Sequence, residues 1–93
     1  MIFQIFAKEN CRLCTKAQKV LSGRGHEMVV RYVEGPNATA ENVADFAWHD
    51  WVDKMPLVVA MDGTDVVERW DGGDIEGAFT PVVQQFLAAH PAP

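Results

Sequence analysis

Residues 2–7 of this 93-residue chain form an almost unbroken apolar run in which Gln4 is the only polar side chain. A short run of this kind is typical of a strand that is buried on both of its faces. Such a strand needs other elements packed against each side. The run therefore predicts the central strand of an α/β sheet that helices cover on both faces.

Apolar residues at helical spacing mark two helices that separate the first three extended runs. The first helix runs from Cys11 to about Ser22, with Asn10 as its expected N-cap. The second follows Thr39, its expected N-cap, and ends near Lys54, because the residue before a proline favours extended backbone.

The other extended runs complete the predicted order of elements. They cover residues 28–33, 57–61 and 66–70. Asp62-Gly63 lies between the last two runs and is a hairpin signal. The order β-α-β-α-β-β-α predicts one α/β domain over residues 1–90 with a four-stranded mixed sheet, and residues 91–93 are expected to be a frayed tail. The helices between the first three strands imply right-handed parallel crossovers for this early part.

The last helix contains a proline, and two tryptophans belong to the helix before it. Asp74 is the expected cap of the last helix. Proline inside a helix costs about 3 kcal/mol, so this helix either starts near Thr80 or is kinked at Pro81. Trp51 is expected in the core, whereas Trp48 is expected at a half-exposed position of the second helix.

Composition and charge narrow the possible partners and compartment. The sequence is 48% hydrophobic and 23% charged, which is typical of a globular domain. The net charge of −5 argues against nucleic acid as a partner, although six basic and two acidic residues give residues 1–31 a net charge of +4. No apolar run reaches the roughly 18 residues of a membrane span, and no signal peptide is visible. A cytoplasmic monomer is expected.

Cys11 and Cys14 are the only cysteines in the sequence, and they lie where the first helix begins. The free N–H groups and the positive dipole end of a helix N-terminus favour thiolate over thiol. Lys8 and Arg12 add positive charge near Cys11, whereas Glu9 opposes it. The pair therefore predicts a thiol–disulfide redox centre, in which Cys11 attacks and the more buried Cys14 resolves the mixed disulfide.

Other interpretations of these residues stay open. A zinc site needs about four ligands, and the remaining candidates, His26, His49 and His90, lack ligand spacing. The two thiols could also be inert and buried. No metal is therefore expected. Lys16 and Lys19 either strengthen the positive field around the cysteines or are only the solvated face of the helix.

Three separated motifs resemble the glutaredoxin branch of the thioredoxin fold, and the resemblance covers nearly the whole chain. They are Cys11-Arg12-Leu13-Cys14 after the first strand, Met55-Pro56 before the third, and Gly72-Gly73 before the last helix. The resemblance implies a dithiol–disulfide oxidoreductase that reduces protein disulfides or glutathione mixed disulfides. It implies no tightly bound cofactor, with glutathione as a possible co-substrate.

The resemblance also implies which residues contact substrate or glutathione. They are Lys8, Arg12, Leu13, Met55, Pro56, Trp70, Gly72, Gly73 and Asp74. Lys8 matches a lysine that contacts the glycine carboxylate of glutathione. A cis bond at Pro56 would expose the Met55 backbone to an extended thiol substrate. Trp70 is a candidate to flank the substrate groove, and Asp74 either caps its helix or binds a substrate ammonium.

Two features of the motifs keep alternatives open. Arg12-Leu13 replaces the Pro-Tyr of typical glutaredoxins and the Gly-Pro of thioredoxins, and Lys54-Met55-Pro56 replaces Thr-Val-Pro. A non-catalytic binding module with this fold is one alternative, and a dimer bridged by an iron–sulfur cluster on Cys11 and glutathione is another. Trp70-x-Gly72 is similar to glutaredoxin-like electron donors of ribonucleotide reductase, so thioredoxin reductase and glutathione are both candidate electron donors.

Overall fold

The computed structural model describes residues 1–49 and 52–90. In chain order, the elements of this part are β1 (Ile2–Ala7), α1 (Arg12–Leu21), β2 (Glu27–Tyr32), α2 (Ala40–Trp48), β3 (Leu57–Asp62), β4 (Asp65–Trp70), α3 (Gly72–Glu76) and α4 (Phe79–Ala89). Trp51 and the tail at residues 91–93, for which we predicted core packing and fraying, lie outside the described residues.

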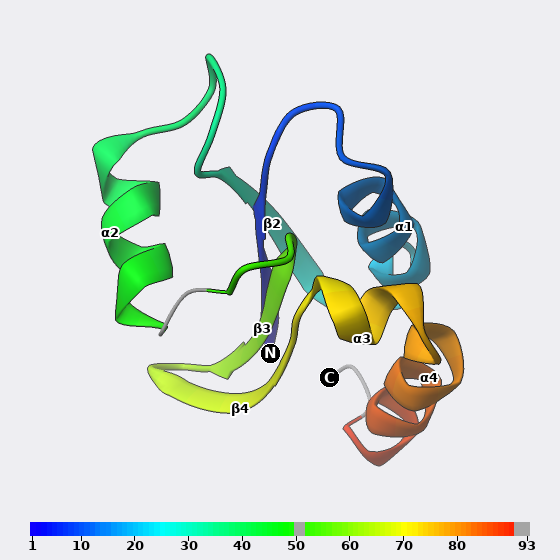
Figure 1. Cartoon of the computed structure of the whole chain (residues 1–93). Helices are drawn as coiled ribbons and strands as arrows, with labels where there is room; N and C mark the ends of the chain where they lie inside the picture. Colours follow the sequence, from blue (N-terminus) through cyan, green and yellow to red (C-terminus); the bar gives the residue numbers. More distant parts are fainter. Residues whose placement is uncertain (50–51, 91–93) are drawn as a thin grey trace.

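The described strands form one mixed sheet in the order β2-β1-β3-β4 (Figure 1). β1 pairs in parallel with β2, as predicted, but β3 is antiparallel to β1. The predicted parallel crossover into the third strand is therefore wrong. β2 ends at Tyr32, opposite Ala7, and β3 begins at Leu57, opposite Phe6. The chain thus leaves and re-enters the sheet at the same end, which reverses the direction of β3.

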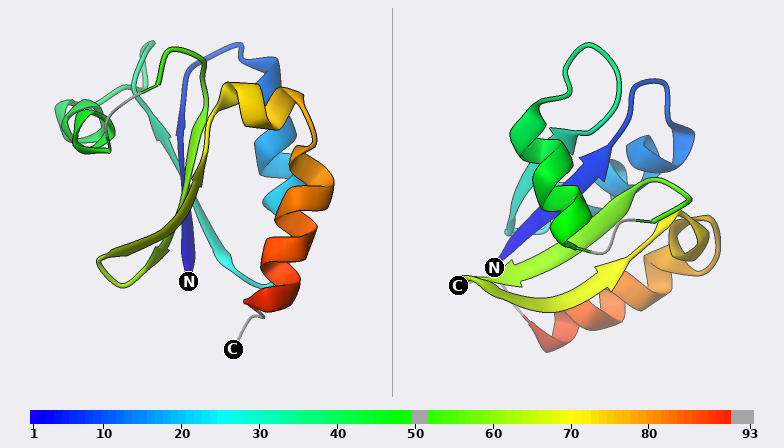
Figure 2. Two further views of the ribbon diagram at one scale, coloured as in Figure 1. Left: turned by 60° about the horizontal axis from the view of Figure 1, so that its bottom comes forward. Right: turned by 60° about the vertical axis from the view of Figure 1, so that its left-hand side comes forward.

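Helices cover both faces of the sheet, as the apolar run of β1 predicted. α2 lies over one face, and α1, α3 and α4 lie over the other (Figures 1 and 2). Side chains of β1 point to opposite faces of the sheet. Phe3 and Ile5 belong to the core under α1 and α4, and Phe6 packs with Phe46 under α2. The α/β class with a mixed sheet is confirmed, and the arrangement is compatible with a thioredoxin-like fold.

The second helix is shorter than its sequence pattern predicted. α2 has Thr39 as its N-cap, as expected, but it ends at Trp48 with His49 as its C-cap, and residues 52–54 are not helical. The guanidinium of Arg69 donates a hydrogen bond to the His49 carbonyl and so occupies an acceptor at the end of this helix. Trp48 is 83% exposed rather than half-exposed.

The predicted last helix is two helices, α3 and α4. Asp71, not Asp74, is the N-cap of α3, and the two carboxylates accept hydrogen bonds from each other's backbone N–H groups at 3.0 Å. Pro81 is the third residue of α4, which begins at Phe79. The first turn of a helix does not need the N–H group that proline lacks. Pro81 therefore lies in a tolerated position, and the break falls before α4.

No helix within residues 1–49 or 52–90 is both long enough and apolar enough to span a membrane.

Candidate active site

Cys11 is itself the N-cap of α1. Its Sγ atom accepts a hydrogen bond from the backbone N–H of Cys14 at 3.1 Å, and its carbonyl accepts from the N–H of Thr15. The prediction of Asn10 as the cap was wrong. Asn10 has a φ of 55°, a left-handed conformation that asparagine tolerates well. This turn delays the start of the helix by one residue and brings the sulfur of Cys11 to the free N–H groups.

Cys11 and Cys14 form a disulfide across the first turn of α1, with Cα atoms 5.2 Å apart. The two cysteines differ in environment. Cys11 is half-buried, whereas Cys14 is 2% exposed and packs in the core beneath the helix with Ala17. The prediction that Cys14 is the more buried member is confirmed, and Cys11 is the sulfur that a large disulfide can approach.

The loop before β3 faces the disulfide across a shallow cavity of about 360 Å³. Its lining residues are Lys8, Asn10, Cys11, Arg12, Leu13, Asp53, Lys54, Met55 and Glu76. Four of the predicted site residues, Lys8, Arg12, Leu13 and Met55, therefore lie around Cys11. The Met55–Pro56 peptide bond is cis, as the resemblance implied, and the ring of Pro56 is fully buried.

Gly72 holds this loop against α3. Its N–H donates to the Lys54 carbonyl at 2.8 Å. A methyl group on Gly72 would lie 2.6 Å from Cγ and 2.7 Å from the carbonyl oxygen of Lys54, and it would also clash with the Met55 carbonyl oxygen. Gly72 thus contributes close backbone contact beside the site, which only glycine permits.

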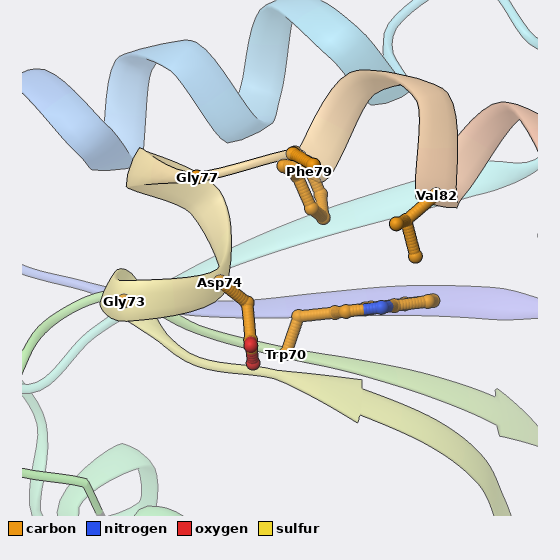
Figure 3. A pocket seen from close by; sticks show the side chains of 7 residues that line it. Trp70, Gly73, Asp74, Gly77, Phe79 and Val82 are labelled. Carbon is orange, nitrogen blue, oxygen red and sulfur yellow. The ribbon is translucent and has the colours of Figure 1, made fainter.

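Three further predicted site residues lie around a different cavity. Gly73, Asp74 and Trp70 line a cavity of about 300 Å³ together with Phe79 and Val82, and Cys11 is not among its lining residues (Figure 3). Trp70 is 6% exposed, and its ring meets that of Phe79 edge to face at 5.8 Å. Trp70 is therefore a core residue here, and the Asp74 carboxylate is part of the cap of α3.

A further cavity, of about 350 Å³, also borders the disulfide. Both cysteines line it with Lys8, Glu9, Asn10, Arg12, Thr15, Gln18 and Tyr32. The carboxylate of Glu9 accepts a hydrogen bond from the Asn37 side chain at 2.7 Å, which ties the cysteine loop to the loop after β2. Cys11 thus lines two cavities, and the lining of this second one at the disulfide is mainly polar.

Charged side chains from distant segments meet beside Cys11. The ammonium of Lys54 lies 3.0 Å from a carboxylate oxygen of Glu76, and the guanidinium of Arg12 lies 3.9 Å from the same oxygen. The hydrogen bond and charge of Lys54 hold the pKa of the Glu76 carboxyl below its ordinary value. We did not predict Glu76, because no local spacing connects α3 with the loop before β3.

Lys16 is more than a solvated residue. Its ammonium donates to the carbonyl of Ile75 at 2.5 Å, near the end of α3 where carbonyls lack helical partners. The side chain therefore joins α1 to α3 below the disulfide. Lys19 lines a separate shallow cavity between α1 and the first turn of α4, together with Arg12 and Thr80.

The histidines lie away from the lining of both cavities at Cys11. His26 contacts the His90 carbonyl at 2.9 Å, and His90 contacts the Phe86 carbonyl at 3.0 Å, so both belong to the packing of α4. Among the residues that the structure describes, no three His, Cys, Asp or Glu side chains gather as potential metal ligands.

Comparison with known protein families, with curated proteins and with solved structures found no significant match.

Proposed function

We propose that the protein is a thiol–disulfide oxidoreductase that reduces protein disulfides or glutathione mixed disulfides. The observation that carries this proposal is the asymmetry of the cysteine pair. Cys11 is half-buried at the N-cap and receives the Cys14 N–H at 3.1 Å, whereas Cys14 is 2% exposed. A hydrogen bond and a helix dipole aimed at one sulfur favour its thiolate, which is the form that attacks disulfides.

The reaction divides between the two sulfurs. The thiolate of Cys11 attacks one sulfur of the substrate disulfide, breaks that bond and releases the first substrate thiolate. Cys14 then loses its proton and attacks the sulfur of Cys11, which forms the Cys11–Cys14 disulfide and releases the second substrate thiolate. Two electrons pass from the dithiol to the substrate, and glutathione or a reductase returns them.

The cavity before β3 suits an extended disulfide substrate. In this cavity Met55 supplies apolar contact and backbone groups, and Lys8 and Arg12 supply positive charge. These cations would attract carboxylates of a peptide or of glutathione. A reducing compartment such as the cytoplasm would keep the pair in the dithiol form that the reaction needs.

An equilibrium redox titration tests the proposed function. The protein is incubated in buffers of defined glutathione or dithiothreitol potential, and the dithiol fraction is counted by alkylation and mass spectrometry. We expect reversible exchange between dithiol and disulfide within roughly −120 to −300 mV, the range of catalytic pairs. A pair that stays fully oxidised or fully reduced throughout this range would favour the binding module without redox activity.

A further inference from the structure

The ion pair between Lys54 and Glu76 lies in the wall of the cavity onto which Cys11 opens. Two cations share its carboxylate: the Lys54 ammonium at 3.0 Å and the Arg12 guanidinium at 3.9 Å. A glutamate carboxyl is ionised at neutral pH, and Lys54 lowers the pKa of Glu76 further. A permanent negative charge therefore lies beside the sulfur that has to become a thiolate.

The charge balance of this cavity changes with the redox state of the cysteines. In the disulfide, Cys11 is uncharged, and Glu76 is the anion paired with Lys54. In the dithiol, the thiolate of Cys11 is a second anion that Lys54 would stabilise and Glu76 would repel. Because the ammonium and the carboxylate are in contact, their fields at Cys11 oppose each other.

We propose that Lys54 and Glu76 are positioning residues that act as a compensated pair, Lys54 raising and Glu76 limiting the thiolate fraction of Cys11. The proposal rests on the proposed function, because it assigns the attacking role to Cys11. Together the two charges would hold the thiolate fraction of Cys11 below the value that the helix N-terminus and Lys54 would give without Glu76.

Other titratable groups also face Cys11 in the reduced protein. From the elements around the two cavities these are Lys8, Glu9, Arg12, the thiol of Cys14, Tyr32 and Asp53. Glu9 is hydrogen-bonded to Asn37. Substitutions at positions 54 and 76 leave these residues unchanged. Glu76→Gln removes the partner of both Lys54 and Arg12, whereas Lys54→Met removes only the charge of Lys54.

The expected shifts are moderate because water screens the pair. The side chains of Lys54 and Glu76 are 51% and 53% exposed, and exposed charges interact weakly through solvent. We expect each single substitution to change the thiolate fraction of Cys11 about threefold at a given pH.

The test measures the pKa of Cys11 in the reduced protein by the pH dependence of its alkylation, with the site identified by mass spectrometry. Glu76→Gln should lower this pKa because Glu76 then no longer compensates the charges of Lys54 and Arg12. Lys54→Met keeps the aliphatic stem that packs near Gly72 and should raise the pKa. The double variant should return close to the wild-type value.

Glu27→Gln, at the opposite end of the sheet, is the control for net charge and should leave the pKa of Cys11 unchanged.

A purely structural ion pair gives a different pattern. Both single variants would then leave the pKa of Cys11 unchanged or move it in the same direction, and either result overturns the inference. Thermal unfolding of each variant separates these effects from loss of fold. The alkylation profile does not require turnover, so a failed redox titration would reject the proposed function independently of the result for Lys54 and Glu76.

Discussion

The Cys11→Ser variant is expected to lose at least about 10³-fold of the proposed disulfide reductase activity, while its fold is retained. A serine hydroxyl keeps the size and the hydrogen-bonding capacity of the N-cap, but it is not ionised near neutral pH and does not attack sulfur. Turnover of a mixed-disulfide peptide by the reduced protein, with the electron donor in excess, measures this loss.

Cys14→Ser is the matched control for this substitution. It leaves Cys11 able to attack, so the first thiolate is still released once per protein molecule, and a large excess of glutathione has to resolve the mixed disulfide. Circular dichroism and thermal unfolding of both variants establish that they fold. Turnover by a folded Cys11→Ser variant at a rate near that of the wild type would contradict the assigned role of Cys11.

Gly72→Ala is expected to lower the free energy of unfolding by about 2–3 kcal/mol, as forced overpacking does. The added methyl group has no space, since it meets the Lys54 carbonyl oxygen at 2.7 Å and the Met55 carbonyl oxygen. The loop before β3 would have to move away from α3, and the 2.8 Å hydrogen bond from Gly72 to Lys54 would be strained. Chemical denaturation followed by tryptophan fluorescence measures the change.

Gly73→Ala is the matched control, because the two glycines are neighbours in the same helix. A methyl group on Gly73 meets only the side-chain oxygen of Asp71, at 3.3 Å, and alanine favours helix over glycine by about 1 kcal/mol. We expect its free energy of unfolding to stay within about 1 kcal/mol of the wild-type value. Equal destabilisation by the two substitutions would show that the close contact at Gly72 is not the cause.

Local patterns were sufficient to predict much of the sheet. The apolar run 2–7 predicted a strand buried on both faces, and Asp62-Gly63 predicted the hairpin of β3 and β4. The direction of β3 was not predictable in the same way. It depends on which end of the sheet the chain re-enters after α2, and hydrophobic spacing carries no information on that choice.

In the candidate site, too, some features were predictable from the sequence and others were not. The redox role of the cysteine pair was predicted from its spacing and position, and the resemblance to glutaredoxins implied the cis bond at Pro56. The structure places Lys8, Arg12 and Met55 around Cys11. Local sequence patterns did not predict which residues from distant segments lie next to each other. Trp70 is buried against α4 instead of lining the cavity at Cys11.

The pairing of Lys54 with Glu76 is a second case of distant segments in contact. The fold, and no sequence motif, joins the loop before β3 to α3. Residues that adjust the ionisation of a catalytic group are hard to predict for this reason, because their effect depends on distance in space and not on spacing along the chain.

We assign the attack on the substrate disulfide to Cys11 and the resolution of the mixed disulfide to Cys14. The most direct measurement compares the rate at which each single-cysteine variant, Cys14→Ser and Cys11→Ser, acquires glutathione from glutathione disulfide at neutral pH, followed by mass spectrometry. We expect Cys11 to be modified at least about tenfold faster than Cys14, because thiolate character and access control the rate and Cys14 is 2% exposed. Equal rates, or faster modification of Cys14, would contradict it.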